Sequence, residues 1–341
     1  MNHQMKNTRA RRRKRKRSPF RRLMRFVLVV SLLFVLSAAG YGGYLAYKIK
    51  ANADKSFVDL DKDKSDLRMD EVKLGKDPVT ILLVGIENYQ ANDVGRADVI
   101  KLITINPETK ETAMINIPRD TRTYIPAIEE KDKINHSYAY GKKGMREQAV
   151  MEATEELLGV PIDYFVSTNF DGFEDVVDEL GGITVNVPFD FKQASFNRMI
   201  TFKEGPMELD GEEALAFVRM RKQDPRGDIG RNERESEAIR AIMDKAISVQ
   251  SFSKADNVID QLGSNVKTNI STTEMFAMRN FYKTLKNKEF ETLQLKTYPE
   301  TINGVSYEIP TDESVLEIRE KLSKILDIEN ELPNADNDYN Q

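Results

Sequence analysis

Three apolar runs follow one another closely in this chain: VTILLV (79–84), VIKLITI (99–105) and TAMINI (112–117). Each is rich in Val, Ile and Leu and has the length of a buried strand. The segment NPETK (106–110), between the second and third runs, supplies residues typical of a turn. The three runs therefore predict neighbouring strands of one sheet.

Helical patterns alternate with further strands along the rest of the chain. Asp210 and Glu213 have the spacing of a capping box at the start of a helix. The other predicted elements are strands over 164–168, 183–187 and 290–298 and helices over 145–158, 170–180, 231–250, 255–262, 272–285 and 312–326. Strands that alternate with helices predict an α/β layered fold with helices on both faces of a sheet.

Charge divides the 341 residues into two parts of opposite sign. Residues 1–50 hold 14 Lys and Arg and no acidic residue, so residues 51–341 hold 37 of the 51 basic and all 55 acidic residues. This larger part has a formal charge of −18, which would repel a phosphate backbone and disfavours nucleic acid as a partner. The chain has no Cys, which excludes disulfides, thiolate metal sites and Cys nucleophiles.

An uncharged run of 22 residues occupies positions 26–47 and follows 12 Lys and Arg. A helix of this length spans a hydrocarbon core of roughly 30 Å, and the basic flank is retained inside. A cleaved signal peptide ending near residues 38–40 is the alternative. The first reading gives a cytoplasmic basic tail (1–25), a transmembrane helix (26–47), a spacer (48–76), an extracytoplasmic domain (77–328) and a disordered acidic tail (329–341).

Arginines recur in short polar motifs after or before the predicted elements. The motifs are GRAD (95–98), IPRD (117–120), RMR (219–221) and GDIGRNER (227–234). Planar guanidinium groups bind phosphate oxygens through two parallel hydrogen bonds, and helix N-termini favour anions. These motifs suggest a phosphate or pyrophosphate site. The alternative is that the same residues form ion pairs and helix caps.

Two carboxylates, Glu87 and Asp98, fall near the same edge of the predicted sheet. Hard oxygen ligands of this kind, together with phosphate oxygens and water, suit Mg²⁺. The only histidines are His3 and His136, so a His-based zinc site and a Ser-His-Asp triad find little support. We expect His136 to have a structural role.

Six segments in this order resemble the LytR-CpsA-Psr family of bacterial cell-wall proteins, over about residues 79–250. They are ILLVGIEN (81–88), GRADVIKLITINPETKETAMINIPRDT (95–121), DKINHSYAYG (132–141), VVDELGGITVNVP (176–188), LDGEEALAFVRMRK (209–222) and GDIGRNERE (227–235). The resemblance implies a three-layer αβα sandwich with a central mixed sheet, preceded by one transmembrane helix.

The resemblance also implies an activity: transfer of a phosphoglycopolymer, of the wall teichoic acid or capsule type, from a polyprenyl-pyrophosphate carrier to peptidoglycan. The partners would be that lipid-linked polymer, peptidoglycan and the membrane. Rival readings are a polyprenyl-pyrophosphate phosphohydrolase and a non-catalytic regulator that binds lipid-linked polymer.

The resemblance assigns roles to individual residues. It implies that Arg96, Arg119, Arg219, Arg221 and Arg231 bind the pyrophosphate and that Glu87 and Asp98 hold Mg²⁺. Asp98, Arg119 and Arg231 are then the candidate catalytic residues, with Arg122 and Arg234 as weaker candidates for the site. This chain departs from the family pattern at Glu87, where Asp is usual, and at Glu235, where Gln is usual.

Overall fold

The computed structural model describes residues 44, 47, 56–62, 64–87, 94–248, 266–271, 274 and 291–328. The predicted helices over 255–262 and 272–285, apart from residue 274, lie outside these residues, as do both predicted tails. Among the described residues, no helix is long and apolar enough to cross a membrane. The predicted span over 26–47 also falls outside them, apart from Tyr44 and Tyr47.

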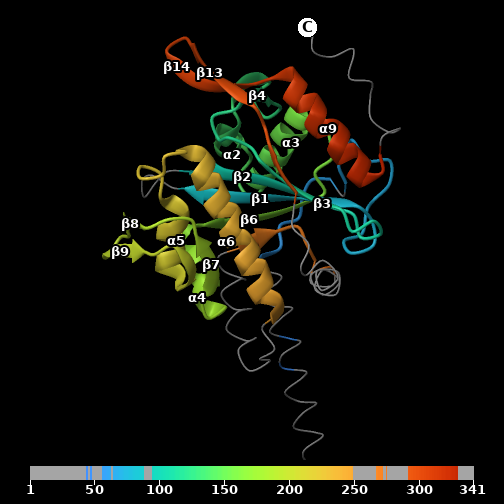
Figure 1. Ribbon diagram of the computed structural model, residues 1–341. Helices are drawn as coiled ribbons and strands as arrows, with labels where there is room; N and C mark the ends of the chain where they lie inside the picture. The colour runs from blue at the N-terminus through green and yellow to red at the C-terminus, as the bar shows by residue number, and fades with distance from the viewer. Residues whose placement is uncertain are drawn as a thin grey trace, which may run out of the picture. The chain divides into compact units, whose positions relative to one another are not determined.

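A six-stranded sheet forms the centre of the fold, in the order β11-β6-β1-β2-β3-β12 (Figure 1). Its strands are β1 (Val79–Glu87), β2 (Arg96–Ile105), β3 (Thr112–Asn116), β6 (Tyr164–Asn169), β11 (Val266–Thr268) and β12 (Glu291–Gln294). The β1–β2, β2–β3 and β11–β6 pairs are antiparallel, whereas β1–β6 and β3–β12 are parallel. The expected mixed α/β fold with a central mixed sheet is confirmed.

Most of the predicted elements form close to the expected bounds. The helices are α3 (Arg146–Leu158), α4 (Phe170–Glu179), α5 (Gly211–Arg219), α6 (Asp228–Ser248) and α9 (Asp312–Leu326), and the capping box at Asp210 and Glu213 is present. Helix α6 begins three residues before the predicted start. The predicted strand over 290–298 is wrong, because β12 and β13 (Thr297–Ile302) are separate strands that belong to different sheets.

Short elements that the sequence pattern did not reveal surround the sheet. They are β4 (Arg122–Ile125), β5 (Glu130–Lys133), η1 (Ile134–His136), α2 (Ser137–Tyr140), β8 (Phe191–Ala194), β9 (Met199–Phe202), β10 (Gly205–Leu209) and β14 (Val305–Pro310). The strands among them form the two-stranded pairs β4–β5 and β8–β9, while β10 pairs with β7 (Ile183–Val187), which was predicted, and β14 pairs with β13. Such short strands lack the long apolar periods on which sequence prediction depends.

Helices cover both faces of the sheet (Figure 1). On one face, Leu82, Leu102 and Phe165 share a core with residues of α3 and α9. On the other face, Ile81, Ile103 and Met114 share a core with Leu74 and with residues of α6. Residues that alternate along one strand therefore enter different cores, which explains why the strands read as continuous apolar runs.

A third core lies beside the sheet and packs against the middle of α6. It is built from the strand pairs β7–β10 and β8–β9 and from α5. The rings of Phe191, Phe202 and Phe217 contact one another there, with their centroids 4.5 to 6.2 Å apart. Ala238 and Ile242 of α6 pack against this core. Helix α6 thus packs against the sheet on one side and against the third core on the other, and these two contacts fix its position.

Part of the stretch predicted as a spacer, residues 48–76, packs against the domain. Arg68 is buried and donates two hydrogen bonds to the Asp163 carboxylate, at 2.9 and 2.7 Å. Leu74 enters the core on the α6 face, and Phe57 forms a bridge to Thr268. Arg68 and Leu74 therefore contribute buried contacts that the weak periodicity of the stretch did not predict.

Candidate functional site

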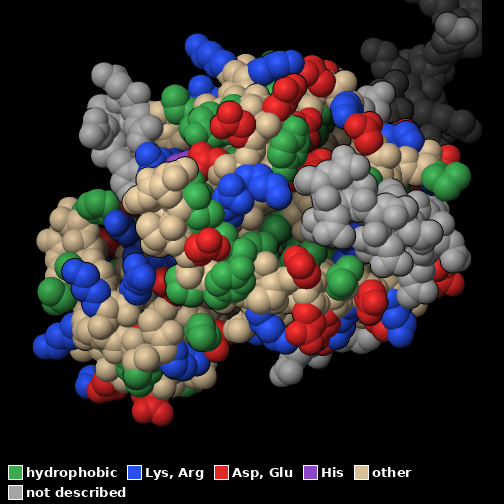
Figure 2. All heavy atoms as spheres, turned by 90° about the horizontal axis from the view of Figure 1, so that it is seen from above, with side chains coloured by type: hydrophobic (Ala, Val, Ile, Leu, Met, Phe, Trp, Pro, Cys, Tyr) green, Lys and Arg blue, Asp and Glu red, His purple; other side chains and the backbone are tan. Residues whose placement is uncertain are grey.

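Several secondary-structure elements begin or end along one edge of the sheet. Strands β1 and β3 end there and β2 begins there, because β2 is antiparallel to both. A cavity of about 410 Å³ opens at this edge between the start of α6 and the segment that follows β3. Four of the predicted site residues line it, Asp98, Arg119, Arg221 and Arg231. Figure 2, which looks down on the molecule, shows basic and acidic side chains side by side on that face.

A β-bulge sets the position of Asp98. Gly85 pairs with Val99 and Ile86 with Ala97, so Asp98 is the extra residue of β2. A bulge redirects the side chain of its extra residue and increases the local twist. A Cβ atom on residue 85 would lie 2.9 Å from the Cβ of Val99, so glycine permits the close approach of the two strands.

Arg119 and Asn135 hold the Asp98 carboxylate. Arg119 Nη1 lies 2.9 Å from Asp98 Oδ2, and Asn135 Nδ2 donates to Asp98 Oδ1 at 3.3 Å. The backbone N–H of Asn135 also donates to the Arg119 carbonyl at 3.2 Å, which ties η1 to the IPRD segment. Asn135 was missed in the sequence, because nothing in its local pattern indicates that η1 returns to Asp98.

Asp228 joins the two arginines that come from the end of α5 and the start of α6. Its Oδ2 lies 2.7 Å from Arg221 Nη2 and its Oδ1 lies 3.2 Å from Arg231 Nη2. Asp228 is the first residue of α6, where a carboxylate is favoured by the free N–H groups of the helix. An acid three residues before an arginine is a signal from which this contact could have been predicted.

Arg219 and Glu87 form a separate pair beside the cavity. Arg219 Nη2 lies 3.8 Å from Glu87 Oε1, and its guanidinium lies over the rings of Phe170 and Phe196, at 4.8 and 5.3 Å from their centroids. Neither residue lines the cavity that holds Asp98. Arg96, which is exposed, is the cross-strand neighbour of Glu87. The predicted site residues are therefore divided between the cavity and this adjoining pair.

The two weaker candidates lie elsewhere. Arg234 is buried, and it bonds to Asp224 and to the carbonyl oxygens of Phe217 and Met220 within the third core. The guanidinium of Arg122 lies 5.8 Å from the ring centroid of Tyr307. Because α6 begins at Asp228 and not at the predicted residue 231, Arg231 lies in its first turn and Arg234 in its second.

Glu235, which stands where the family usually has Gln, has a buried counter-ion. Glu235 Oε2 lies 3.2 Å from the ammonium of Lys101, whose side chain is 0% exposed, and Glu235 Oε1 lies 3.5 Å from Arg231 Nε. Burial lowers the pKa of Lys101, and the Glu235 carboxylate opposes that shift. Sequence reasoning missed Lys101, although a single Lys inside an apolar strand is itself an uncommon feature.

The oxygen atoms at this edge can be compared with what a magnesium ion requires. Asp98 and Glu87 offer carboxylate oxygens from adjacent strands, and Asn135 Oδ1 is buried without a hydrogen-bond partner in the described structure. No group of three or more Asp, Glu or His suited to a metal occurs among the residues described. The donor chemistry fits Mg²⁺ if phosphate oxygens and water complete the shell.

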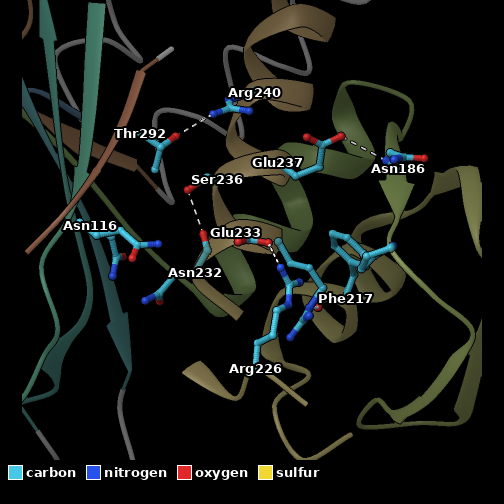
Figure 3. Close-up of a pocket in the computed structure, with 13 residues that line it drawn as sticks. Asn116, Asn186, Phe217, Arg226, Asn232, Glu233, Ser236, Glu237, Arg240 and Thr292 are labelled. Atoms are coloured by element: carbon cyan, nitrogen blue, oxygen red, sulfur yellow. Dashed lines mark hydrogen bonds and ion pairs between the residues drawn. The ribbon is translucent and has the colours of Figure 1, made fainter. Parts of the chain in front are cut away.

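A second cavity, of about 420 Å³, lies along the next turns of α6. Figure 3 shows its wall: Asn232, Ser236 and Arg240 project from α6, and Asn116 and Thr292 lie on the strands opposite. Arg240 Nη2 donates to Thr292 Oγ1 at 3.0 Å. The two cavities share Asn116, Asn232 and Gln294, so the second cavity adjoins the arginine site.

His136 belongs to a polar network behind η1. Its Nδ1 lies 2.8 Å from Asp132 Oδ2, which also accepts a hydrogen bond from the Tyr140 hydroxyl at 2.8 Å. That hydrogen bond and burial raise the pKa of Tyr140 to about 12. The contacts agree with the structural role expected for His136.

With this geometry described, the chain can be compared with known proteins. The LytR_cpsA_psr family model matches residues 43–324. This chain belongs to the LytR-CpsA-Psr family. It is 38% identical over 314 residues to the polyisoprenyl-teichoic acid–peptidoglycan teichoic acid transferase TagV of Bacillus subtilis, a match that covers 90% of this chain and 80% of that protein. It is 39% identical to TagU of the same organism, over 92% of this chain and 99% of TagU.

Solved structures of relatives share this family fold. The crystal structure of B. subtilis TagV superposes with a TM-score of 0.64 and covers 74% of this chain and 98% of that one. A structure of TagT bound to LI-WTA is 34% identical, has a TM-score of 0.64 and covers 78% of this chain and 97% of TagT. The likeness thus extends over almost the whole length of both solved relatives.

Proposed function

We propose that this protein transfers a teichoic-acid-type glycopolymer from a polyprenyl-diphosphate carrier to peptidoglycan. The observation that carries the proposal is the convergence of Arg119, Arg221 and Arg231 on one cavity, from three separate segments of the chain. Relatives that carry the name teichoic acid transferase match nearly the full chain. Guanidinium groups held in place before binding suit the dense negative charge of a diphosphate.

The chemistry of the step assigns work to each of these residues. A sugar hydroxyl of the acceptor attacks the phosphorus next to the polymer and loses its proton to solvent, a new phosphodiester bond forms, and the anhydride bond breaks to release the prenyl phosphate. Negative charge accumulates on the phosphate oxygens, so Arg119 and Arg231 would stabilise the transition state and Arg221 would orient the diphosphate. Arg219 and Arg96, at the adjoining pair, are proposed as further phosphate ligands.

We also propose that Glu87 and Asp98 hold Mg²⁺ beside the phosphates. The ion would supply electrostatic stabilisation of phosphate oxygens when it is bound. Both carboxylates pair with arginines, Glu87 with Arg219 and Asp98 with Arg119. When Mg²⁺ binds the two carboxylates, each arginine would be free to pair with a phosphate. The negative phosphates would then balance the charges of the arginines, and the Mg²⁺ would balance the charges of the carboxylates.

The location of the reaction follows from the substrates. Polyprenyl carriers are membrane lipids and peptidoglycan is external, so we propose a three-layer αβα domain outside the cell, anchored by one transmembrane helix over 26–47. The uncharged run and the basic flank that precedes it support this arrangement.

The decisive experiment measures transfer by the full chain in detergent. The assay contains a polyprenyl-diphosphate-linked glycopolymer, glycan strands and Mg²⁺, and it quantifies polymer bound to glycan together with released prenyl phosphate. We expect Arg119→Ala to lower kcat by about 100-fold or more, because one phosphate-stabilising group is lost. Arg122→Ala is the matched control, since Arg122 lies outside the cavity, and should stay within about twofold of the parent chain.

Other outcomes would identify the rival functions. Prenyl phosphate released without polymer on the glycan would indicate hydrolysis. Tight binding of the lipid-linked polymer with no turnover would indicate a binding regulator. Equal activity of the parent chain and Arg119→Ala would refute the assignment of the cavity.

A further inference from the structure

Lys101 places a positive charge inside the sheet. It is the third residue of the apolar run VIKLITI (99–105), and its side chain is completely buried. Along β2 it shares a face with Ile103, which packs in the core on the α6 side. An ammonium group is expensive to remove from water unless it is paired and hydrogen-bonded. A lysine here therefore requires a dedicated set of acceptors.

That set of acceptors comes from β3 and α6. The ammonium donates to Oδ1 of Asn116, its direct cross-strand neighbour, at 2.8 Å. It donates to the Asn232 carbonyl at 3.3 Å and to Ser236 Oγ at 3.4 Å. Figure 3 shows Asn116 on its strand and Asn232 and Ser236 on the neighbouring helix. Lys101 thereby links the sheet to the second and third turns of α6.

The fourth partner connects Lys101 to the candidate active site. Glu235 lies in the cavity wall, with one carboxylate oxygen 3.2 Å from Lys101 Nζ and the other 3.5 Å from Arg231 Nε. The Arg231 Nε atom is buried and has no hydrogen-bond partner in the described structure, so this contact is an ion pair without hydrogen-bond geometry. The carboxylate of Glu235 thus stands between an interior cation and a cation of the cavity.

Removal of the Lys101 ammonium would take away one of the two cations that balance the charge of the Glu235 carboxylate. Without Lys101, Arg231 would be the remaining cation close to Glu235, and the carboxylate would compete with a bound phosphate for it. The unbalanced charge would also repel a diphosphate, and more strongly than in water because the group is largely buried. Lys101 does not itself line the cavity, and among its partners that do, Asn116, Asn232 and Glu235, only Glu235 carries a charge.

We propose that Lys101 is a positioning residue, which neutralises Glu235 from inside the sheet and so keeps Arg231 available for the diphosphate. This inference rests on the proposed function, since it concerns the same site. It explains how a carboxylate can stand one turn beyond Arg231 in a cavity that receives phosphates. It also predicts that Lys101 and Glu235 act as one unit, so their substitutions are not additive.

A double-mutant cycle tests this coupling with inorganic pyrophosphate as the probe. Isothermal titration compares the full chain in detergent with Lys101→Met, Glu235→Gln and the double variant. We expect Lys101→Met to weaken binding at least tenfold and the double variant to return to within threefold of the parent chain. Glu235→Gln should bind at least as tightly as the parent, because a negative charge is removed.

Controls separate this effect from general loss of structure or charge. Lys267→Met removes an exposed lysine and should leave pyrophosphate affinity within twofold. Circular dichroism reports whether each variant is folded. If Lys101→Met does not fold, the prediction for Glu235→Gln remains, and a tenfold weaker binding by that variant would overturn the inference.

The inference and the proposed function can fail separately. Equal weakening by Lys101→Met and by the double variant, both folded, would exclude the coupling while leaving the arginine site in place. Parent-level binding by folded Lys101→Met would exclude it too. A parent chain that does not bind pyrophosphate at all would refute the proposed site itself.

Discussion

Arg231 is held by acidic neighbours on two sides before any ligand binds. Asp228 lies 3.2 Å from its Nη2 and Glu235 lies 3.5 Å from its Nε. The Asp228 contact orients the planar guanidinium, which a lysine ammonium cannot reproduce because it lacks the fork of donors. The orientation of Arg231, and not only its charge, is therefore expected to matter.

Arg231→Lys tests this point, because it keeps the charge and removes the fork. We expect the affinity for inorganic pyrophosphate to fall about tenfold or more, since one bidentate interaction is lost. Titration of the full chain measures it. The matched control is Arg198→Lys, at an exposed arginine that pairs with carboxylates away from the cavity. An unchanged affinity for Arg231→Lys would mean that charge alone suffices.

Glu155 gives the domain a pH-dependent stability. Burial raises the pKa of Glu155 from its ordinary value of 4.5 to about 7. The folded state then keeps a proton that the unfolded chain loses above pH 4.5. The stabilisation from protonated Glu155 is therefore complete below the pKa of this group in the unfolded chain. It is lost as the pH rises through the pKa of the group in the folded state.

The corresponding experiment compares urea unfolding at pH 5 and pH 8. From pH 5 to pH 8, deprotonation of Glu155 should lower the free energy of unfolding of the parent chain by up to about 3 kcal/mol. The decrease should be correspondingly smaller in Glu155→Gln. Glu156→Gln, at an exposed neighbouring position, should behave like the parent chain. The same pH dependence in Glu155→Gln and the parent would contradict the assignment.

At the scale of secondary-structure elements, the β-bulge between β1 and β2 determines the position of Asp98. The strands are long and apolar, yet the ladder is interrupted at one residue near its end. Ala97, Ile100 and Leu102 then share one core despite the odd spacing between the first two. The bulge therefore places a carboxylate at the sheet edge without disturbing the burial of the strand.

Gly85→Ala should disturb this device, because the added Cβ would lie 2.9 Å from the Cβ of Val99. We expect a loss of about 1–3 kcal/mol in the free energy of unfolding, together with reduced transfer activity. Urea unfolding and the transfer assay measure the two effects. The double variant Gly85→Ala/Val99→Gly, which removes the opposing Cβ, should recover much of the activity, and the absence of any recovery would argue against steric displacement of Asp98.

For the whole molecule, the stretch before β1 is part of the folded unit. Arg68 and Asp163 form a bidentate pair in which the side chains are 5% and 4% exposed, and Asp163 also accepts a hydrogen bond from the Thr80 N–H at 2.9 Å. The pair connects residues 95 positions apart in the chain. Its loss would leave a buried carboxylate without a counter-ion.

Arg68→Ala should therefore lower the free energy of unfolding by about 3–5 kcal/mol. Lys62→Ala is the control, because Lys62 forms an exposed pair with Asp66 and should change it by less than about 1 kcal/mol. Urea unfolding of the full chain measures both. A small effect of Arg68→Ala would mean that the stretch is not part of the cooperative unit.

The sequence by itself determined the three central strands β1 to β3, the main helices that the structure describes, and the arginines and carboxylates of the candidate site. Long apolar runs and capping residues are local signals, so β1 to β3, α3, α9 and the capping box of α5 could be predicted from them. The arginine motifs could be recognised because their order along the chain is a family pattern.

Only the tertiary structure decided how those residues are grouped. Arg119, Arg221 and Arg231 line one cavity with Asp98, whereas Arg219 pairs with Glu87 beside it and Arg234 is buried in another core. Asn135 and Lys101 gained their roles from contacts across the fold. The physical reason is that hydrogen bonds and ion pairs act over a few ångströms in space, between residues whose separation along the chain carries no information about that distance.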